Sequence, residues 1–171
     1  MRIVSCRRRS RSCANARGLT LIELIIAFAI IGLLAGAAVP VVKVRIKRDK
    51  EIELRRDLWE MRDAIDRYKD AADRGAFQTK VDSLGYPPDL QTLVDGVDVQ
   101  GKKLRFLRSI PVDPMTGNTD WGLIKDANDN VMGVYSKSTR VPIKVDGFQA
   151  GEESFRAATQ YQGWRFVYPP Q

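Results

Sequence analysis

The stretch Arg17-Gly18-Leu19-Thr20-Leu21-Ile22-Glu23-Leu24, with the apolar run that continues to Val42, decides the fold of this chain. Residues 19–42 contain a single charged side chain, Glu23. A helix of this length measures about 36 Å at 1.5 Å per residue, which is enough to cross a hydrocarbon core of about 30 Å. The sequence therefore predicts a transmembrane helix over residues 19–42.

Glu23 is the anomaly of this helix, because it places a carboxylate one turn into an otherwise apolar span. An acidic residue at the centre of a membrane helix costs about 2.5–3.5 kcal/mol on insertion scales, and less near an end. We therefore expect Glu23 to have a partner rather than to lie alone in lipid.

The segment ahead of the helix is basic and contains no acidic residue. Of the 28 Lys and Arg residues of the chain, six lie in residues 1–18, so 22 remain beyond it against 21 acidic residues. Most of the net charge of +7 thus lies in this segment, and the rest of the chain is nearly neutral. This distribution does not favour a nucleic-acid partner. Under the positive-inside rule a basic flank stays in the cytoplasm, so we expect residues 1–18 to be a cytoplasmic leader.

The spacing of this region resembles the class III signal of type IV pilins and type II secretion pseudopilins. Gly18, one hydrophobic residue, and then Thr20-Leu21-Ile22-Glu23-Leu24 match its pattern. The family has glutamate at the fifth mature position and often proline at the twenty-second, which correspond to Glu23 and Pro40. Leu19 departs from the family, where phenylalanine or methionine is more usual.

The resemblance implies a processing and assembly route. A prepilin peptidase would cut between Gly18 and Leu19 and methylate the new amino terminus at Leu19. In a packed filament that ammonium would neutralise Glu23 of a neighbouring subunit, while Pro40 would loosen the helix locally. Glu23 and Pro40 are the predicted assembly residues, and Gly18 and Leu19 the predicted processing residues.

The resemblance also implies a function, partners and a location. The expected function is a structural subunit of a type II secretion pseudopilus, which drives protein export across the outer membrane. The expected partners are further copies of the chain, the prepilin peptidase, an inner-membrane assembly platform, minor pseudopilins and the membrane itself. The chain would be a single-pass protein of the bacterial inner membrane with a cytoplasmic N-terminus and a periplasmic head domain.

Two alternatives remain open. One is a type IV pilus subunit for adhesion or motility. The other is a periplasmic binding protein whose secretory signal has its apolar core at residues 19–34 and its cleavage site at Ala35-Gly36-Ala37. Glu23 argues against this second alternative, because it would interrupt the apolar core of a secretory signal without any benefit to the signal.

The next segment, residues 43–74, predicts the amphipathic second half of the same helix. Apolar residues recur at intervals of four and three, at Leu54, Leu58, Met61, Ile65, Tyr68 and Ala72. Ile52 and Trp59 lie beside this stripe and are expected to widen it. Gly75 is the expected helix stop. The basic cluster Lys43, Arg45, Lys47 and Arg48 is read as a solvated helical face rather than a lipid-binding patch.

Residues 75–171 predict a small head domain with an antiparallel sheet, so the fold class is α+β and pilin-like. A turn at residues 85–89 precedes a short helix that ends before Gly96. Strands are expected at residues 119–125, 131–136 and 163–168, the first two joined by a five-residue loop, and an extra strand is possible at residues 141–145. The run from Leu104 to Asn118, with Asp113-Pro114 and Gly117-Asn118, resembles the G-type major pseudopilin.

Candidate sites in the head are few. The chain has no histidine, which removes the commonest general base and metal ligand, and its two cysteines, Cys6 and Cys13, both lie in the leader. No enzyme, no cofactor and no disulfide in the mature chain are expected. Asp126, Asn128 and Asn130 match only half of a calcium loop, so we expect a polar turn there. The late aromatic residues are expected in the core: Trp121, Trp164, Phe166 and Tyr168.

Overall fold

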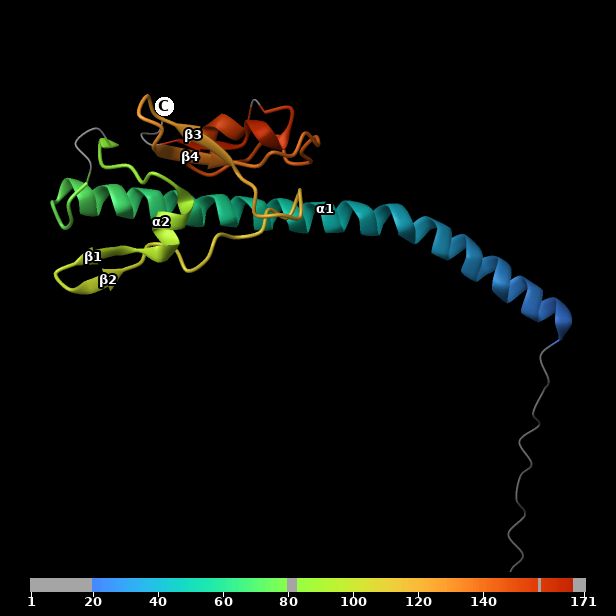
Figure 1. The fold of residues 1–171 in the computed structure, drawn as a ribbon. Helices are drawn as coiled ribbons and strands as arrows, with labels where there is room; N and C mark the ends of the chain where they lie inside the picture. Colours follow the sequence, from blue (N-terminus) through green and yellow to red (C-terminus); the bar gives the residue numbers. More distant parts are fainter. Residues whose placement is uncertain (1–19, 80–82, 157, 168–171) are drawn as a thin grey trace, which may run out of the picture. The chain divides into compact units, whose positions relative to one another are not determined.

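The computed structural model describes residues 20–79, 83–156 and 158–167. By its internal contacts the chain divides into two units, Met1–Val42 and Lys43–Gln171. A single helix, α1 (Leu21–Asp73), runs through the division and carries Pro40 in its interior (Figure 1). The predicted α+β arrangement, a long N-terminal helix with a small antiparallel sheet, is confirmed.

Both ends of α1 have local causes. At the start, Oγ1 of Thr20 accepts a hydrogen bond from the backbone N–H of Glu23 at 3.3 Å, as a capping residue does. At the end, Gly75 adopts a φ of 68°. The N–H of Gly75 then donates to Ala72 O at 2.9 Å, and that of Ala76 to Ala71 O at 3.0 Å. This pair of bonds is a Schellman motif, and it confirms the predicted stop.

In the second unit the apolar stripe of α1 forms the core of the head. Its members from Leu54 to Tyr68 are buried, and so are Ala64 and Ala71, whereas the predicted Ala72 is only half-buried. Trp59 lies against the ring of Phe166 at a centroid distance of 4.7 Å. Ile52 was expected to widen this face, but it is exposed, because it lies on the side of the helix away from the buried stripe.

The main sheet has three antiparallel strands in the order β3–β4–β5. They span Gly122–Lys125, Val131–Tyr135 and Arg165–Val167. The first two strands pair in the predicted hairpin, with Gly122 opposite Tyr135 and Lys125 opposite Val131. β3 and β4 are shorter than predicted and β5 begins later than predicted, whereas the five-residue loop between β3 and β4 agrees with the prediction.

A second sheet was not predicted. It is the hairpin of β1 (Val97–Val99) and β2 (Lys102–Leu104), which follows the short helix α2 (Leu90–Asp95). Gln100 and Gly101 form its turn with φ values of 51° and 79°, the left-handed pair that a two-residue hairpin turn requires. Three residues per strand are too few to show alternation, so the Gln-Gly pair was the only sequence signal.

The segment after β4 returns to the sheet without forming the extra strand that was possible at residues 141–145. It contains two short 3₁₀ turns, η2 (Glu153–Phe155) and η3 (Tyr161–Gly163), before β5. Its aromatic residues gather in a cluster in which Phe155 stacks on Trp164 at 5.2 Å and Tyr161 meets Trp164 edge-on at 5.1 Å. Packing of these rings, rather than strand pairing, holds this segment.

Candidate functional site

The first unit contains the residues predicted to govern assembly. The described large apolar side chains from Leu21 to Val42 are exposed along α1, and by length and composition this part can cross a membrane, with a mean hydropathy of 2.6. Glu23 is exposed on this surface, and within the described part of the chain its carboxylate has no ion-pair partner. An apolar cylinder with one unpaired carboxylate is therefore available to another molecule.

The other predicted residues of this unit stand as follows. Gly18 and Leu19 lie outside the described residues. Pro40 lies within α1, and its effect on the helix in a filament remains a prediction. Gly32 and Gly36 leave open space on the helix surface, because a Cβ added at either would meet no atom within 4 Å. Close approach of a second helix at these two positions is sterically possible.

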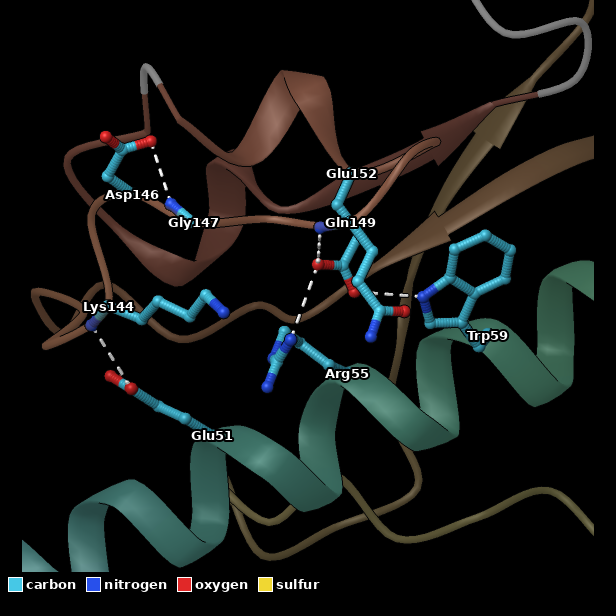
Figure 2. A network of polar contacts seen from close by, with 8 residues as sticks. All are labelled: Glu51, Arg55, Trp59, Lys144, Asp146, Gly147, Gln149 and Glu152. Atoms are coloured by element: carbon cyan, nitrogen blue, oxygen red, sulfur yellow. Dashed lines mark hydrogen bonds and ion pairs between the residues drawn. The ribbon is translucent and has the colours of Figure 1, made fainter.

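In the second unit, a polar network joins α1 to the loop that precedes η2. Glu51, Arg55 and Trp59 are spaced four residues apart, so they lie along one face of α1 and point toward the loop of residues 143–152 (Figure 2). We call these three residues, with Glu152 of the loop, the helix–loop network. Two of its members are buried carboxylates.

Glu51 is the first of them and is 3% exposed. Its carboxylate accepts hydrogen bonds from the hydroxyl of Tyr161 at 2.7 Å and from the backbone N–H groups of Ile143 and Lys144. Burial, and then the hydrogen bond to Glu51, raises the pKa of Tyr161, so the phenol stays protonated and donates. Two consecutive backbone N–H groups that converge on one carboxylate do not have the alternating directions of a β-strand, in agreement with the absence of a strand at residues 141–145.

Glu152 is the second and is 1% exposed. It accepts from Nε1 of Trp59 at 2.9 Å and from Nη1 of Arg55 at 3.4 Å, and from the backbone N–H of Gln149 at 3.2 Å (Figure 2). The indole of Trp59 is thereby held by its polar end at Glu152 and by its ring against Phe166. These contacts connect the helix to the loop.

The loop that resembled the G-type pseudopilin is closed by a buried aspartate. Asp113 is fully buried, and its carboxylate accepts from Met115 N at 2.7 Å and from Ser136 Oγ at 2.6 Å. Its own N–H donates to Asn118 O at 2.8 Å. The Asp-Pro to Gly-Asn stretch is therefore a closed turn fastened to the end of β4.

The half calcium loop forms the polar turn that was predicted. Oδ1 of Asp126 accepts from the N–H groups of Asn128 and Asn130, each at 2.8 Å, and these bonds with the Asn130 side chain lower the pKa of Asp126. Among the described residues, no group of three or more Cys, Asp or Glu side chains is arranged to hold a metal ion. The absence of a cofactor remains a prediction.

The predicted core aromatics are placed as expected where the structure describes them. Trp121, Trp164 and Phe166 are buried, and Nε1 of Trp121 donates to Pro111 O at 2.9 Å. Tyr168 lies outside the described residues. The described rings of this set belong to the hydrophobic core of the head.

Sequence reasoning missed the buried acids Glu51, Asp57, Asp113 and Glu152. From the sequence, Glu51 was interpreted as one of the acids that neutralise the neighbouring basic cluster on a solvated helical face, and the structure shows that it is buried instead. A signal existed, since Glu51 lies three residues before Leu54 and seven before Leu58 and so belongs to the buried stripe. Asp57 shares a seven-residue spacing with Ala64 and Ala71, which are also buried. Glu152 lies in a loop, so no periodic pattern in the sequence indicates that it is buried.

Comparison with known proteins gives one match. The sequence model described as the prokaryotic N-terminal methylation motif matches residues 13–39. No curated protein and no solved structure matches the chain. The chain therefore carries a type IV pilin-like prepilin signal, and the match covers Gly18, Leu19 and Glu23 but ends before Pro40.

Proposed function

We propose that this chain is a structural subunit of a type II secretion pseudopilus. A prepilin peptidase cleaves between Gly18 and Leu19 and methylates Leu19, and the mature subunits then polymerise through their N-terminal helices. The observation that carries the proposal is the prepilin signal at residues 13–39, whose Glu23 is the one charge on an exposed apolar helix.

The chemistry of docking follows from that charge. Cleavage creates an α-ammonium at Leu19, which pairs with Glu23 of the neighbouring subunit inside the apolar filament core. Desolvation offsets much of the attraction between two buried charges, so such a pair fixes the register of subunits more than it stabilises them. Pro40 lacks a backbone donor and lets the helix yield locally as subunits pack.

The head domain has a mechanical role in this proposal. In a polymerising filament each head must move with its own helix. Glu51 and Glu152 fasten residues 143–152 to α1 through buried hydrogen bonds, and the stripe from Leu54 to Ala71 packs the helix into the head. Load on α1 is then transmitted to the head without local unfolding.

Two features favour a pseudopilus over a type IV pilus. Beyond Cys13 the sequence has no cysteine, so no disulfide closes a C-terminal loop as in many adhesive pilins. The sequence from Asp113 to Asn118 resembles that of the G-type major pseudopilin, which supports the same assignment. The proposed partners are the prepilin peptidase, an inner-membrane assembly platform and minor pseudopilins, with the head in the periplasm. No catalytic residue is assigned.

The variant Glu23→Leu tests the docking step. It removes the one charge of the membrane span, so membrane insertion should be kept or improved, while filament assembly should be lost or slowed. Insertion is measured by membrane fractionation, and assembly by the yield of sheared or cross-linked filaments. Glu23→Asp is the matched control that keeps the charge and should retain part of the assembly. Normal polymerisation of Glu23→Leu would overturn the pairing.

Deletion of the gene distinguishes the two filament systems. A pseudopilus subunit predicts that folded proteins destined for export accumulate in the periplasm while surface pili remain. Loss of surface pili with export unchanged would instead assign the chain to a type IV pilus.

A further inference from the structure

A pocket in the second unit is lined by cations and contains no acid. Its volume is about 240 Å³, and its lining residues are Lys43, Ile46, Lys47, Lys50, Met115 and Arg140. Three of the cations come from α1, and Arg140 comes from the loop after β4. We call this site the cationic pocket.

The three lysines occupy the face of α1 on which the core is built. Lys43, Lys47 and Lys50 are spaced four and three residues apart, and Leu54 follows four residues later as the first member of the buried stripe. Packing of the head explains leucine on that face, but it does not explain lysine. Four cations therefore line one pocket, an arrangement that packing of the head does not require.

These cations are not neutralised within the described part of the chain. None of Lys43, Lys47, Lys50 and Arg140 forms an ion pair with a described residue. The buried acids nearest in sequence to the lining residues already have donors: Glu51 is bound by Tyr161, and Asp113 by Ser136. The pocket is therefore positively charged and available to an anion.

The position of the cationic pocket in the chain indicates which kind of anion it meets. Lys43 directly follows Val42, where the apolar run ends, so all three lysines come within eight residues of that end. In the proposed membrane-anchored state, basic residues this close to the end of the apolar run lie near the lipid phosphates and attract anionic lipids. Ile46 lines the pocket and is 52% exposed, which suits the apolar part of a lipid rather than a fully hydrated ion.

We propose that the cationic pocket binds the phosphate headgroup of an anionic phospholipid at the membrane surface. The lysines supply point charges, and the guanidinium of Arg140 supplies paired donors for phosphate oxygens. This revises the interpretation of Lys43 and Lys47 as a solvated face. The proposal rests on the membrane anchoring in the proposed function, but not on polymerisation. The bound lipid holds the pocket at the bilayer surface.

Native mass spectrometry of the full-length chain in a neutral detergent tests this proposal. The chain is titrated separately with phosphatidylglycerol, phosphatidylcholine and inorganic phosphate. The test variant combines Lys43→Gln, Lys47→Gln, Lys50→Gln and Arg140→Gln. The control variant removes four exposed cations elsewhere in the head, with Lys102→Gln, Lys103→Gln, Arg105→Gln and Arg108→Gln.

The wild-type chain should bind phosphatidylglycerol about tenfold or more tightly than phosphatidylcholine, since several basic residues contribute together. The test variant should lose this preference, and the control variant should keep it. A melting temperature no lower than that of the wild type shows that the test variant is folded. The single variant Lys47→Glu should weaken the preference in the same direction.

Three results would overturn the proposal. Equal losses in the two quadruple variants would mean that net charge, and not the pocket, attracts the lipid. Binding of inorganic phosphate as strong as that of phosphatidylglycerol would mean a site for free phosphate. No lipid preference, together with weaker cross-linking between copies of the test variant, would assign the pocket to a carboxylate of a second copy. The assay needs no filament, so failure of the proposed polymerisation would not change its outcome.

Discussion

Asp57 shows how a single buried acid can work against the fold. It lies on α1 with only 4% of its surface exposed, and among the described residues its carboxylate forms an ion pair with the exposed Arg56 alone, at 3.4 Å. Burial raises the pKa of Asp57, while Arg56 lowers it and the carboxylates of Glu53 and Glu60 add to the rise. The ionised form is therefore less favourable in the folded state than in the unfolded chain.

The sign of the pH effect follows from this raised pKa. The folded state binds the proton more tightly, so the contribution of Asp57 to stability is present below the unfolded pKa and is lost as pH rises through the folded pKa. The variant Asp57→Asn has no such loss. Its melting temperature in detergent should exceed that of the wild type at pH 7, and the difference should shrink toward pH 3. A melting temperature for Asp57→Asn below that of the wild type at pH 7 would mean that the carboxylate is stabilised by contacts stronger than its burial cost.

At the scale of elements, the helix–loop network decides how the segment after β4 is held. This segment is bound by the buried carboxylates Glu51 and Glu152 and by a cluster of aromatic rings. Removing one partner of a buried charged pair leaves the other charge buried without compensation. The loss of stability is then larger than the stabilisation that the intact pair provided. The indole N–H of Trp59 would then lose its acceptor as well.

Glu152→Ala tests this tie. It should lower the free energy of unfolding by about 2–4 kcal/mol. We expect a value near the lower end of this range, because the Arg55 side chain still reaches solvent and its charge is partly hydrated. Glu152→Gln should cost less, because its amide oxygen still accepts from Trp59. The measurement is thermal unfolding of the full-length chain in detergent, read by tryptophan fluorescence.

The neighbouring Glu153 provides the matched control. It is exposed and accepts one hydrogen bond, from Gly151 N at 2.9 Å. Glu153→Ala should change the free energy of unfolding by no more than about 0.5 kcal/mol. Equal effects at the two positions would show that the network does not hold the segment.

At the scale of the whole molecule, the elements with a clear local sequence pattern were predicted correctly. The stripe from Leu54 to Tyr68, the stop at Gly75 and the hairpin around residues 126–130 have strong local causes, and the structure confirms them. The β1–β2 hairpin and the path of residues 136–163 were not predicted. The first is too short for a pattern, and the second depends on contacts with α1 that lie about 90–110 residues away in sequence.

The candidate site was predictable to a different degree in the two units. Glu23 and the proposed processing residues, Gly18 and Leu19, lie in a sequence motif of fixed spacing that a family model also matches, so they can be proposed from sequence alone. The cationic pocket was not predictable, because Arg140 and Met115 join the lysines only after the head has folded. From the sequence alone, lysines on a helix are expected to be solvated, because the loop that lies beside them in the fold is not known.

The N-terminal sequence and intact mass of the protein purified from native membranes test the central claim most directly. We predict a mature chain that begins at N-methylated Leu19, lacks residues 1–18 and remains in the membrane fraction. A soluble chain that begins near Ala38 would mean a cleaved secretory signal, and it would contradict both the membrane-anchored subunit and the assembly through Glu23.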